Sequence, residues 1–561
     1  MLACERWRRL VLLVAGTMLL LAWLLPNHYS PWLSAYQEFF SFFAGLFFLS
    51  SVLFAPVHIR PSFVVFFLLA FIPLFQYSMG LILFFGDAWV ASLYLFAFSL
   101  MLLVGYNLAQ SPGLSEFLAR IFAGLFVFGS IVSIWIALRQ WLQLPGSVWM
   151  VDLPSGGRPF ANLMQPNNLA TLLCLGCAGT LYLYERYSLG SVVASLLAGF
   201  LFFGVALTLS RTPWVAIMVV SAFWAWKSLA FKFRLTLRAL LFWVGVYALF
   251  VLLLPHISEW LFLSGEGLSQ RAQALERLGI WGQLWFAVLQ GPFWGYGWNQ
   301  IGMAQVDVTL AYPLPIMTEH SHNIILDLLL WNGPVLGGGI VVFVAIWLFC
   351  LGVRARTVES LFSLIAAGFM LVHAMLEFPL EYAYFLLPLG VLLGSVQGEQ
   401  CATHEIKFPR LLLAALMSFL GGLFFWVWCE YRIVEVSTQL LRFENARVGN
   451  LKAERVAPDV VVLSQLRELI RYARTSPTEG MSSRDLEWMR RVSRRYPNPP
   501  SLFRYAQALA LNGHSEAARD QLLILRGLYG DHRYKERIAE LQLMQEHHPV
   551  LADVMALLPR F

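Results

Sequence analysis

The sequence predicts an all-α protein that crosses a membrane many times and carries a helical, water-soluble domain at its C-terminal end. Of the 561 residues, 59% are hydrophobic and only 13% are charged, about half the charged share of a soluble globular protein. Mean hydropathy is +0.66. The charge is also unevenly spread. Residues 1–429 hold 19 Lys/Arg and 17 Asp/Glu, whereas the much shorter stretch 430–561 holds 20 and 16.

This break in composition divides the chain into a transmembrane part, residues 1–429, and a soluble domain, residues 430–561. The composition excludes a wholly soluble enzyme and a protein anchored by one span. The isoelectric point of 9.0 and the net charge of +6 do not indicate a nucleic-acid partner, because the basic residues of the membrane part follow a topological pattern. We therefore expect the lipid bilayer as a partner, and no nucleic acid.

Thirteen segments approach the length of about 20 apolar residues that a membrane-spanning helix needs. The first follows Arg6, Arg8 and Arg9 and is longer than the core of a signal peptide, so we expect an uncleaved span. The sequence thus predicts a transmembrane bundle of about 12 to 13 spans. The thirteen segments lie near residues 10–25, 35–54, 62–79, 88–108, 118–140, 166–184, 190–208, 212–229, 239–255, 323–350, 360–376, 380–397 and 410–428.

The distribution of Lys and Arg predicts the orientation of this bundle. If the N-terminus faces the cytoplasm and the spans alternate, 14 basic residues fall on the cytoplasmic side and five on the outer side, as the positive-inside rule requires. An odd number of spans places the C-terminal domain outside the cytoplasm. The five outer arginines depart from the rule and are therefore candidates for function. They are Arg139, Arg158, Arg211, Arg271 and Arg277.

Two outer loops are long, residues 141–165 and 256–322. The second is too long for a simple connection. It contains five tryptophans, an amphipathic stretch over residues 270–289 and the turn-rich segment Gly291-Pro-Phe-Trp-Gly-Tyr-Gly-Trp298, so we expect it to be ordered. Its aromatic side chains can form a belt at the membrane interface or stack on sugar rings, and the sequence leaves both open.

The second loop ends in Glu319-His320-Ser-His322-Asn323, directly before a span. Two histidines beside Glu319 or Asp327 can bind a metal ion, but no third histidine is near in sequence. Asn323, or the serine between the histidines, can cap the following helix. His322 itself can act as a general base or orient a reacting group.

The first loop ends in Arg158-Pro-Phe-Ala-Asn-Leu-Met-Gln165-Pro-Asn167-Asn, at the start of another span. Four amides and an arginine at the mouth of a helix are costly if they are buried without partners. They either cap the helix, with Pro166 in its first turn, or form hydrogen bonds with a ligand.

Five motifs on the outer side together resemble the O-antigen ligase/polymerase superfamily. The resemblance is strongest to the bacterial protein O-oligosaccharyltransferases of the PglL or pilin-glycosylase type. The motifs follow the family's order: Arg158-Pro-Phe-Ala-Asn-x-x-Gln165-Pro-Asn167-Asn-Leu-Ala170; Leu209-Ser210-Arg211; Arg277-x-x-x-Trp281 with Gly291-Pro-x-x-Gly295-x-Gly297-Trp298; His320-Ser-His322-Asn323-x-x-Leu326; and Glu377-Phe-Pro-Leu-Glu-Tyr382-Ala-Tyr384-Phe.

The resemblance implies a GT-C-like fold in the inner membrane of a bacterium and a reaction in the periplasm. The enzyme would move a preassembled glycan from undecaprenyl pyrophosphate to a Ser or Thr hydroxyl of a periplasmic protein such as type IV pilin. No metal and no cofactor are implied. Attack of the hydroxyl on C1 of the sugar would invert the anomeric configuration.

The resemblance also implies roles for individual residues. Arg211 and Arg277 would bind the pyrophosphate, because guanidinium groups match phosphate oxygens bidentately and stabilise the charge of the leaving group. His322 would orient or deprotonate the acceptor hydroxyl, with His320 as second choice. Further substrate-binding candidates are Arg158, Gln165, Asn167, Tyr382 and Tyr384. Two tyrosines fit the last motif, and the sequence does not choose between them.

The C-terminal domain contains a pattern typical of a tetratricopeptide-like helical hairpin. Residues 500–511 form one predicted helix, Asn512-Gly513 the turn, and residues from Glu516 the return helix. Further helices are expected near 484–495 and 533–547. One hairpin is fewer than the three repeats that a free-standing solenoid needs. The domain is therefore either a small bundle packed on the membrane part or a docking surface for the acceptor protein.

Two other classes of function stay open at the level of sequence. An O-antigen ligase, with lipid A core as acceptor, or an O-antigen polymerase would need the same pyrophosphate chemistry. The soluble domain and the Gln165 motif favour a protein acceptor. A transporter or flippase would carry ionisable residues deep within its spans, whereas here the polar motifs lie at the outer ends.

Overall fold

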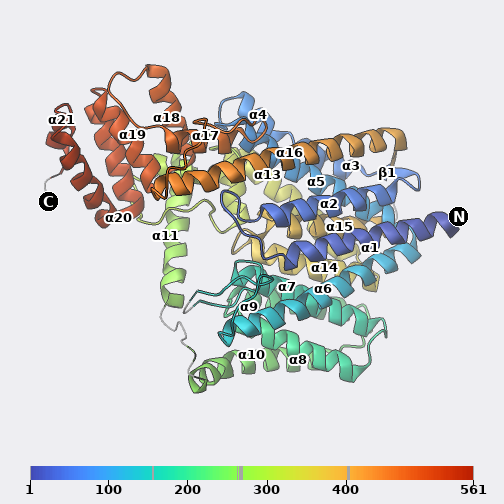
Figure 1. The fold of residues 1–561 in the computed structure, drawn as a ribbon. Coiled ribbons are helices and arrows are strands. Elements are labelled where there is room, and N and C mark those ends of the chain that lie inside the picture. Colours follow the sequence, from blue (N-terminus) through green and yellow to red (C-terminus); the bar gives the residue numbers. More distant parts are fainter. Residues whose placement is uncertain (1, 155–156, 262, 264–268, 401–404, 560–561) are drawn as a thin grey trace. The chain divides into compact units, whose positions relative to one another are not determined.

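The computed structural model of the chain describes residues 2–154, 157–261, 263, 269–400 and 405–559, and only the backbone of residues 2–4 and 269–275. The regular secondary structure of the described chain is almost entirely helical (Figure 1). It forms two compact units, each made of three separate stretches. The first unit comprises residues 1–70, 93–268 and 345–425, and the second comprises residues 71–92, 269–344 and 426–561.

Each of the thirteen predicted spans coincides with helical structure. The third consists of two helices, α3 and α4, because Pro73 lies in the first turn of α4 and cannot continue a preceding helix. The helices are α1 (Leu2–Leu24), α2 (Ala35–Val52), α3 (Pro61–Leu69), α4 (Ile72–Ser78), α5 (Phe85–Ala109), α6 (Pro112–Trp141), α7 (Pro166–Glu185), α8 (Ser191–Leu207), α9 (Thr212–Ser228), α10 (Leu237–Trp260), α13 (Ile324–Arg354), α14 (Val358–Ala374), α15 (Ala383–Gly398), preceded by the 3₁₀ turn η1 (Pro379–Glu381), and α16 (Arg410–Asn445).

Seven helical segments in the described part of the chain are long and apolar enough to cross a membrane. Three more helices, α8, α14 and α15, are apolar but shorter. The protein is therefore a multi-pass membrane protein, as predicted. The count of thirteen crossings and the orientation of the termini stay predictions.

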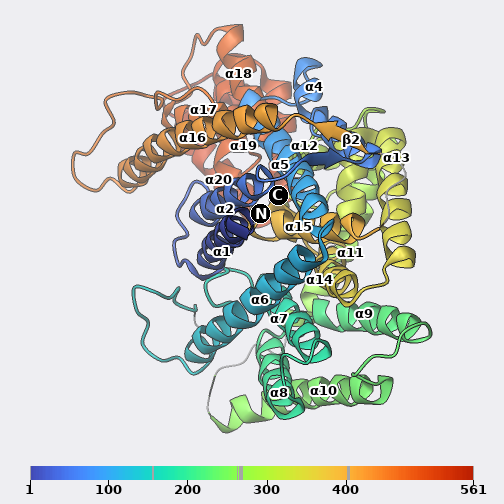
Figure 2. The same ribbon diagram turned by 90° about the vertical axis from the view of Figure 1, so that its right-hand side faces the viewer.

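In the first unit, α7 packs against both α6 and α14, and α8 lies beside α10 (Figures 1 and 2). The polar loops gather at the two ends of this bundle. At one end, the Arg8 side chain donates to the Ser51 carbonyl and Asn107 bonds the backbone of His58. At the other, Asn162 donates to the Leu24 carbonyl. Apolar helices with polar loops at both ends agree with the alternation that the sequence predicts.

A short antiparallel ribbon departs from the all-α prediction. Strands β1 (Val57–Ile59) and β2 (Ile406–Phe408) pair with Val57 opposite Phe408. Each strand has only three residues, too few to leave a period-two pattern in the sequence.

The second unit contains the helices of the C-terminal region and of the long outer loop. Helices α19 and α20 form the predicted hairpin, with Gly513 at φ +80° in the turn, and Gly530 divides α20. The likeness to tetratricopeptide repeats stays a prediction. The helices are α11 (Ser269–Gln290), α12 (Ile301–Val308), α17 (Ser464–Arg474), α18 (Ser483–Arg495), α19 (Pro499–Leu511), α20 (Ser515–Gln545) and α21 (Leu551–Leu557).

Candidate active site

The first unit brings three of the five sequence motifs together through buried hydrogen bonds. Asn167, in the first turn of α7, donates from Nδ2 to Oε1 of Glu377 at 2.8 Å. Its Oδ1 accepts from the Ser210 hydroxyl at 2.6 Å. Gln165 Nε2 lies 3.5 Å from the second oxygen of Glu377. The amides of the first loop therefore have protein partners, and they connect segments about 40 and 210 residues away.

One buried amide orders the loop before α7. The Gln140 side chain, at the end of α6, donates to the carbonyls of Val151 and Ala161 and accepts from the backbone amides of Phe160 and Ala161. It is only 5% exposed. A single side chain that forms four hydrogen bonds to the loop backbone fixes the loop's path, and with it the approach to Gln165.

Arg158 and Arg211 are brought to the same part of the first unit. Arg158 donates from Nη1 to the Leu209 carbonyl at 3.3 Å, two residues before Arg211. Arg211 is exposed and directly precedes α9. The N-terminus of a helix carries a partial positive charge that attracts anions, so this arginine and its helix favour the same kind of ligand.

Burial distinguishes the two tyrosines that the sequence left open. Tyr384 is 2% exposed, and its hydroxyl accepts a hydrogen bond from Asn168 at 3.1 Å. Tyr382 is half-buried, and its ring stacks on that of Tyr384 with 5.0 Å between centroids. Tyr384 is thus a supporting residue inside the helix bundle, and Tyr382 is the accessible one of the pair.

In the second unit, α11 and the histidine loop are joined by one indole. Trp281 donates from Nε1 to the Ser321 carbonyl at 2.8 Å. Arg277 lies one helical turn before Trp281, and residues four apart share a helix face. The loop that carries His320 and His322 is therefore fixed to the part of α11 that carries Arg277.

The residues around the histidines hold the loop and cap α13. Asn323 Oδ1 accepts from the amides of Ile325 and Leu326, which confirms it as the predicted helix cap. Asp327 Oδ1 accepts a hydrogen bond from the Ser321 amide at 2.9 Å, so this carboxylate stabilises the loop. Among the described residues, no three His, Cys, Asp or Glu side chains are grouped as metal ligands.

The backbone is strained at several motif positions. His322 has φ +58°, in the left-handed region that non-glycine residues rarely adopt. Of eight such non-glycine residues in the described chain, five lie within or next to the motifs. Strain of this kind persists only where the surroundings enforce it, and it concentrates at functional sites. The five are Ala161, Met164, Leu209, Asn299 and His322.

The glycine-rich segment 291–298 packs against a break in α13. Gly333 there has φ +74° and a non-helical ψ, directly before a proline. The amides of Tyr296 and Gly297 donate to the carbonyls of Leu330 and Trp331. A Cβ at Gly333 would come within 1.9 Å of the Phe293 carbonyl oxygen. These glycines therefore allow backbone to approach backbone, which satisfies the carbonyls freed by the break.

This packing also divides the aromatic side chains of the loop. Tyr296 and Trp298 are buried, and the Trp298 ring lies 4.9 Å from that of Trp331. Phe293 and Trp294 are 57% and 55% exposed. Half of the aromatic motif is thus part of the protein core, and only the exposed half can form an interfacial belt or stack on a sugar.

The C-terminal helices bind other parts of the second unit through arginines of α18. Arg495 forms a bidentate pair with Asp87, with nitrogen–oxygen distances of 2.9 and 3.0 Å. Arg494 pairs with Asp307 of α12 at 2.7 Å. The C-terminal region is therefore integrated with residues 71–92 and with the long outer loop, within the same compact unit.

The predicted site residues fall into two groups, one in each unit. Sequence reasoning did not single out Glu377, Ser210 or Gln140 as site residues, although the first two lie in quoted motifs. Buried polar residues in apolar surroundings are a signal that could have identified them. The side chain of Arg271 lies outside the described residues. The first group is Arg158, Gln165, Asn167, Arg211, Tyr382 and Tyr384, and the second is Arg277, His320 and His322.

Comparison with known proteins agrees with the motifs. A family described as O-Antigen ligase matches residues 196–337, and one described as "Virulence factor membrane-bound polymerase, C-terminal" matches residues 361–543. A general O-oligosaccharyltransferase of Acinetobacter baylyi is 32% identical over 531 residues, covering 93% of each chain. A ComP-specific O-oligosaccharyltransferase of the same organism is 26% identical over 513 residues, covering 90% of this chain and 92% of the relative.

The match to the general enzyme extends over nearly the whole of both chains, so it includes the membrane helices, the outer loops and the C-terminal helices together. The predicted resemblance is thereby confirmed. The chain is a glycosyltransferase and belongs to the O-oligosaccharyltransferases of the O-antigen ligase superfamily.

Proposed function

We propose that this enzyme transfers a preassembled glycan from undecaprenyl pyrophosphate to Ser or Thr hydroxyls of a pilin-like periplasmic protein. The observation that carries the proposal is the Trp281–Ser321 hydrogen bond. It holds the strained His322 next to the stretch of α11 that bears Arg277, so a candidate base and a candidate phosphate-binding group are fixed in one unit.

The arginines supply the chemistry that the donor requires. As the bond between C1 of the sugar and the phosphate oxygen breaks, its electron pair stays on the pyrophosphate. Arg211 and Arg277 bind this anion, and they stabilise the transition state more than the ground state because the charge grows during the step. Pyrophosphate leaves readily, so the step needs no general acid.

His322 acts on the acceptor. The hydroxyl oxygen forms the new bond to C1, and His322 takes the proton as a general base. Since the nucleophile attacks C1 directly from the side opposite the leaving group, the product has the inverted anomeric configuration. Retention of configuration, determined by NMR of the released glycopeptide, would contradict this mechanism.

The remaining residues position the substrates. Arg158 contributes a second guanidinium beside the Arg211 segment. Gln165 and Asn167, held by Glu377, line the approach to it, and Tyr382 presents a half-buried ring. His320 is the second choice for the base. The C-terminal domain contributes the surface on which the acceptor protein docks, in the periplasm of a bacterium whose inner membrane holds the spans.

The proposal is tested by expressing the full chain with a lipid-linked glycan pathway and a candidate pilin, and by measuring the intact pilin mass. Wild type is expected to add the glycan mass. H322A, R277A and R211A are expected to lower transfer by at least about 100-fold, in line with the loss of a general base or an oxyanion-stabilising group.

Matched control variants are available on the same predicted side of the membrane. R139A removes an outer arginine that donates to the nearby Pro145 carbonyl and lies over the ring of Trp135, one helical turn away. H256A removes an exposed histidine. Both should retain transfer. Glycan on lipid A core with none on any protein would contradict the protein acceptor and favour an O-antigen ligase.

A further inference from the structure

A polar cavity lies at the end of the first unit away from the candidate active site. Its volume is about 710 Å³, within the range of small-ligand sites. Helix α15 connects the two regions: Tyr384 lies at its start and Gln397, which lines the cavity, at its end. At 1.5 Å per residue they are about 20 Å apart. No step of the proposed reaction uses this cavity.

The cavity is lined by three arginines, Arg60, Arg354 and Arg356, and by one carboxylate, Glu399. A further cation lies directly behind them. Lys227 Nζ donates to the carbonyls of Val353 and Ala355, on either side of Arg354, at 3.2 and 3.0 Å. The lining therefore carries an excess of positive charge.

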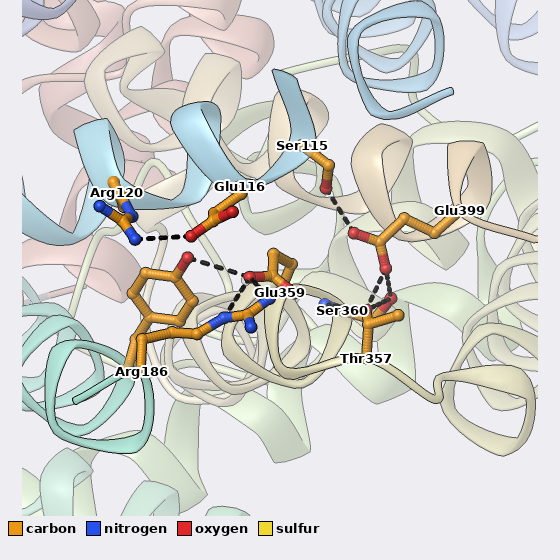
Figure 3. A network of polar contacts seen from close by, with 9 residues as sticks. Ser115, Glu116, Arg120, Arg186, Thr357, Glu359, Ser360 and Glu399 are labelled. Carbon is orange, nitrogen blue, oxygen red and sulfur yellow. Dashed lines mark hydrogen bonds and ion pairs between the residues drawn. The ribbon is translucent and has the colours of Figure 1, made fainter. Parts of the chain in front are cut away.

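Neighbouring arginines at the same end of the bundle are neutralised, as Figure 3 shows. Arg120 pairs with Glu116 at 2.6 Å, and Arg186 pairs with Glu359. By contrast, Arg354 and Arg356 form no ion pair within the described part of the chain.

Glu399 offsets only one of these positive charges. Its carboxylate accepts hydrogen bonds from the hydroxyls of Ser115, Thr357 and Ser360 (Figure 3). The donors to Glu399 are neutral, so its carboxylate offsets one of the three arginine charges, and the lining keeps a net positive charge that an anion can neutralise.

Part of the cavity wall is fixed by hydrogen bonds. Arg60 donates to the Gln400 carbonyl at 3.1 Å and lies over the Tyr106 ring. Gln397 donates to the Ser62 hydroxyl oxygen at 2.9 Å and accepts from the Trp347 indole at 3.2 Å. Because the Arg60 and Gln397 side chains are already held in place, they lose less conformational entropy when a ligand binds.

We propose that this cavity binds the phosphate group of an anionic membrane lipid. Guanidinium groups match phosphate oxygens bidentately, and the Ser62 hydroxyl adds a neutral donor. The position favours a lipid over a soluble phosphate compound. Arg60 directly precedes α3, Arg354 ends α13 and Gln397 lies in the last turn of α15, so the cavity lies at the ends of membrane helices, where lipid headgroups are. Basic pockets between transmembrane helices bind such headgroups.

The test uses the full-length protein, purified in detergent and incubated with phosphatidylglycerol or phosphatidylcholine, and bound lipid is counted by native mass spectrometry. Wild type is expected to retain more phosphatidylglycerol than phosphatidylcholine. R354A/R356A should retain about 10-fold less, equivalent to about 1.4 kcal/mol. E399Q, which removes the one carboxylate, should retain more.

The control variant K232A/R238A removes two exposed basic residues from the same predicted face, outside the cavity. It should retain phosphatidylglycerol like wild type. R354K/R356K keeps the charge without the guanidinium forks and should fall between wild type and R354A/R356A, which guards against a simple folding defect.

Three results would overturn the proposal. If R354A/R356A and K232A/R238A lost equal amounts of bound phosphatidylglycerol, the lipid would be attracted to the basic surface as a whole and not to the cavity. Unchanged retention in R354A/R356A would exclude the cavity. Competition by free glycerol 3-phosphate at the same concentration as the lipid would assign the site to a soluble phosphate compound.

Discussion

His322, the predicted general base, has a strained backbone conformation. Its φ of +58° costs a non-glycine residue about 1 kcal/mol or more. H322G removes the imidazole and the strain, whereas H322A removes only the imidazole. Both variants should lose transfer, and H322G should be more stable than H322A by about 1 kcal/mol. Thermal melts of both variants in detergent, with transfer measured on the same samples, check this. Identical melting temperatures would show that the backbone there is not strained.

Asn167 tests whether the buried hydrogen bonds support the site. N167A removes the acceptor of the buried Ser210 hydroxyl and one donor to the Glu377 carboxylate, and a buried polar group that loses its partner costs about 1–3 kcal/mol. N167D keeps the shape and the acceptor for Ser210 but places a second carboxylate against Glu377. We expect both variants to melt lower than wild type and to lose at least about 10-fold in transfer, about 1.4 kcal/mol of activation energy.

An exposed amide on the same predicted side provides the comparison for Asn167. Q143A alters a residue in the exposed stretch after α6 and should change neither the melting temperature nor transfer. If N167D retained full transfer, the link from Glu377 to Ser210 would have no role in positioning the site.

At this scale the sequence predicts the polar residues but not their partners. Gln165 and Asn167 stand out because buried amides without partners are costly. Glu377 is about 210 residues away, and no local pattern indicates which carboxylate an amide will contact. The choice between Tyr382 and Tyr384 likewise depends on burial, which tertiary packing decides.

At the scale of elements, the contact between α12 and α18 should depend on pH. Burial raises the pKa of Asp307 above its ordinary value of 3.8, although Arg494 opposes this shift. The folded state therefore binds a proton more readily than the unfolded chain. As the pH rises from 3.8 through the raised pKa, this group reduces the stability of the fold, and above that pKa the reduction is complete. D307N should remove this dependence of stability on pH.

The measurement is hydrogen–deuterium exchange of α12 and α18 between about pH 3 and pH 7, a range that includes the ordinary pKa values of both carboxyl groups, corrected for the intrinsic exchange rate. Glu487 on α18 provides a contrast of opposite sign. A hydrogen bond from Arg490 lowers its pKa, so its stabilisation is present above the ordinary value of 4.5 and is lost as the pH falls through the lowered pKa. E487Q should remove that dependence instead. Equal effects of D307N and E487Q would contradict the assignment.

Elements differ in how well the sequence predicts them. The membrane helices are predicted because a long apolar run is a local property, and α11 because its amphipathic period is local too. The eight-residue α12 and the β1–β2 ribbon are not predicted. Both are too short for a period to emerge, and the ribbon pairs residues about 350 apart.

At the scale of the whole molecule, the orientation in the membrane is testable. Alkaline phosphatase, which is active only in the periplasm, should be active when fused after residue 561 and inactive when fused near Lys232. A fluorescent protein that folds in the cytoplasm should give the reverse. A fluorescent fusion at residue 561 would contradict the predicted odd number of spans, whatever the result near Lys232.

The compact units show what composition alone does not reveal. The change in charge near residue 429 predicts which part of the chain prefers water. The second unit instead combines the C-terminal helices with residues 71–92 and the long outer loop, through pairs such as Arg495–Asp87. Such pairs join residues about 400 apart, so a reading of composition along the chain cannot reveal them.

The long separation between Asn167 and Glu377 has a consequence for synthesis. At 5–20 residues per second, the ribosome finishes Glu377 roughly 10–40 s after Asn167. During that interval α7 enters the membrane with amide side chains whose carboxylate partner has not yet been synthesised. Unpaired polar groups cost free energy in an apolar environment. A variant at Glu377 would prolong this state indefinitely. In cells, such a variant should therefore first lower the amount of protein, because it is degraded during biogenesis. Only the protein that survives would show a lower transfer rate.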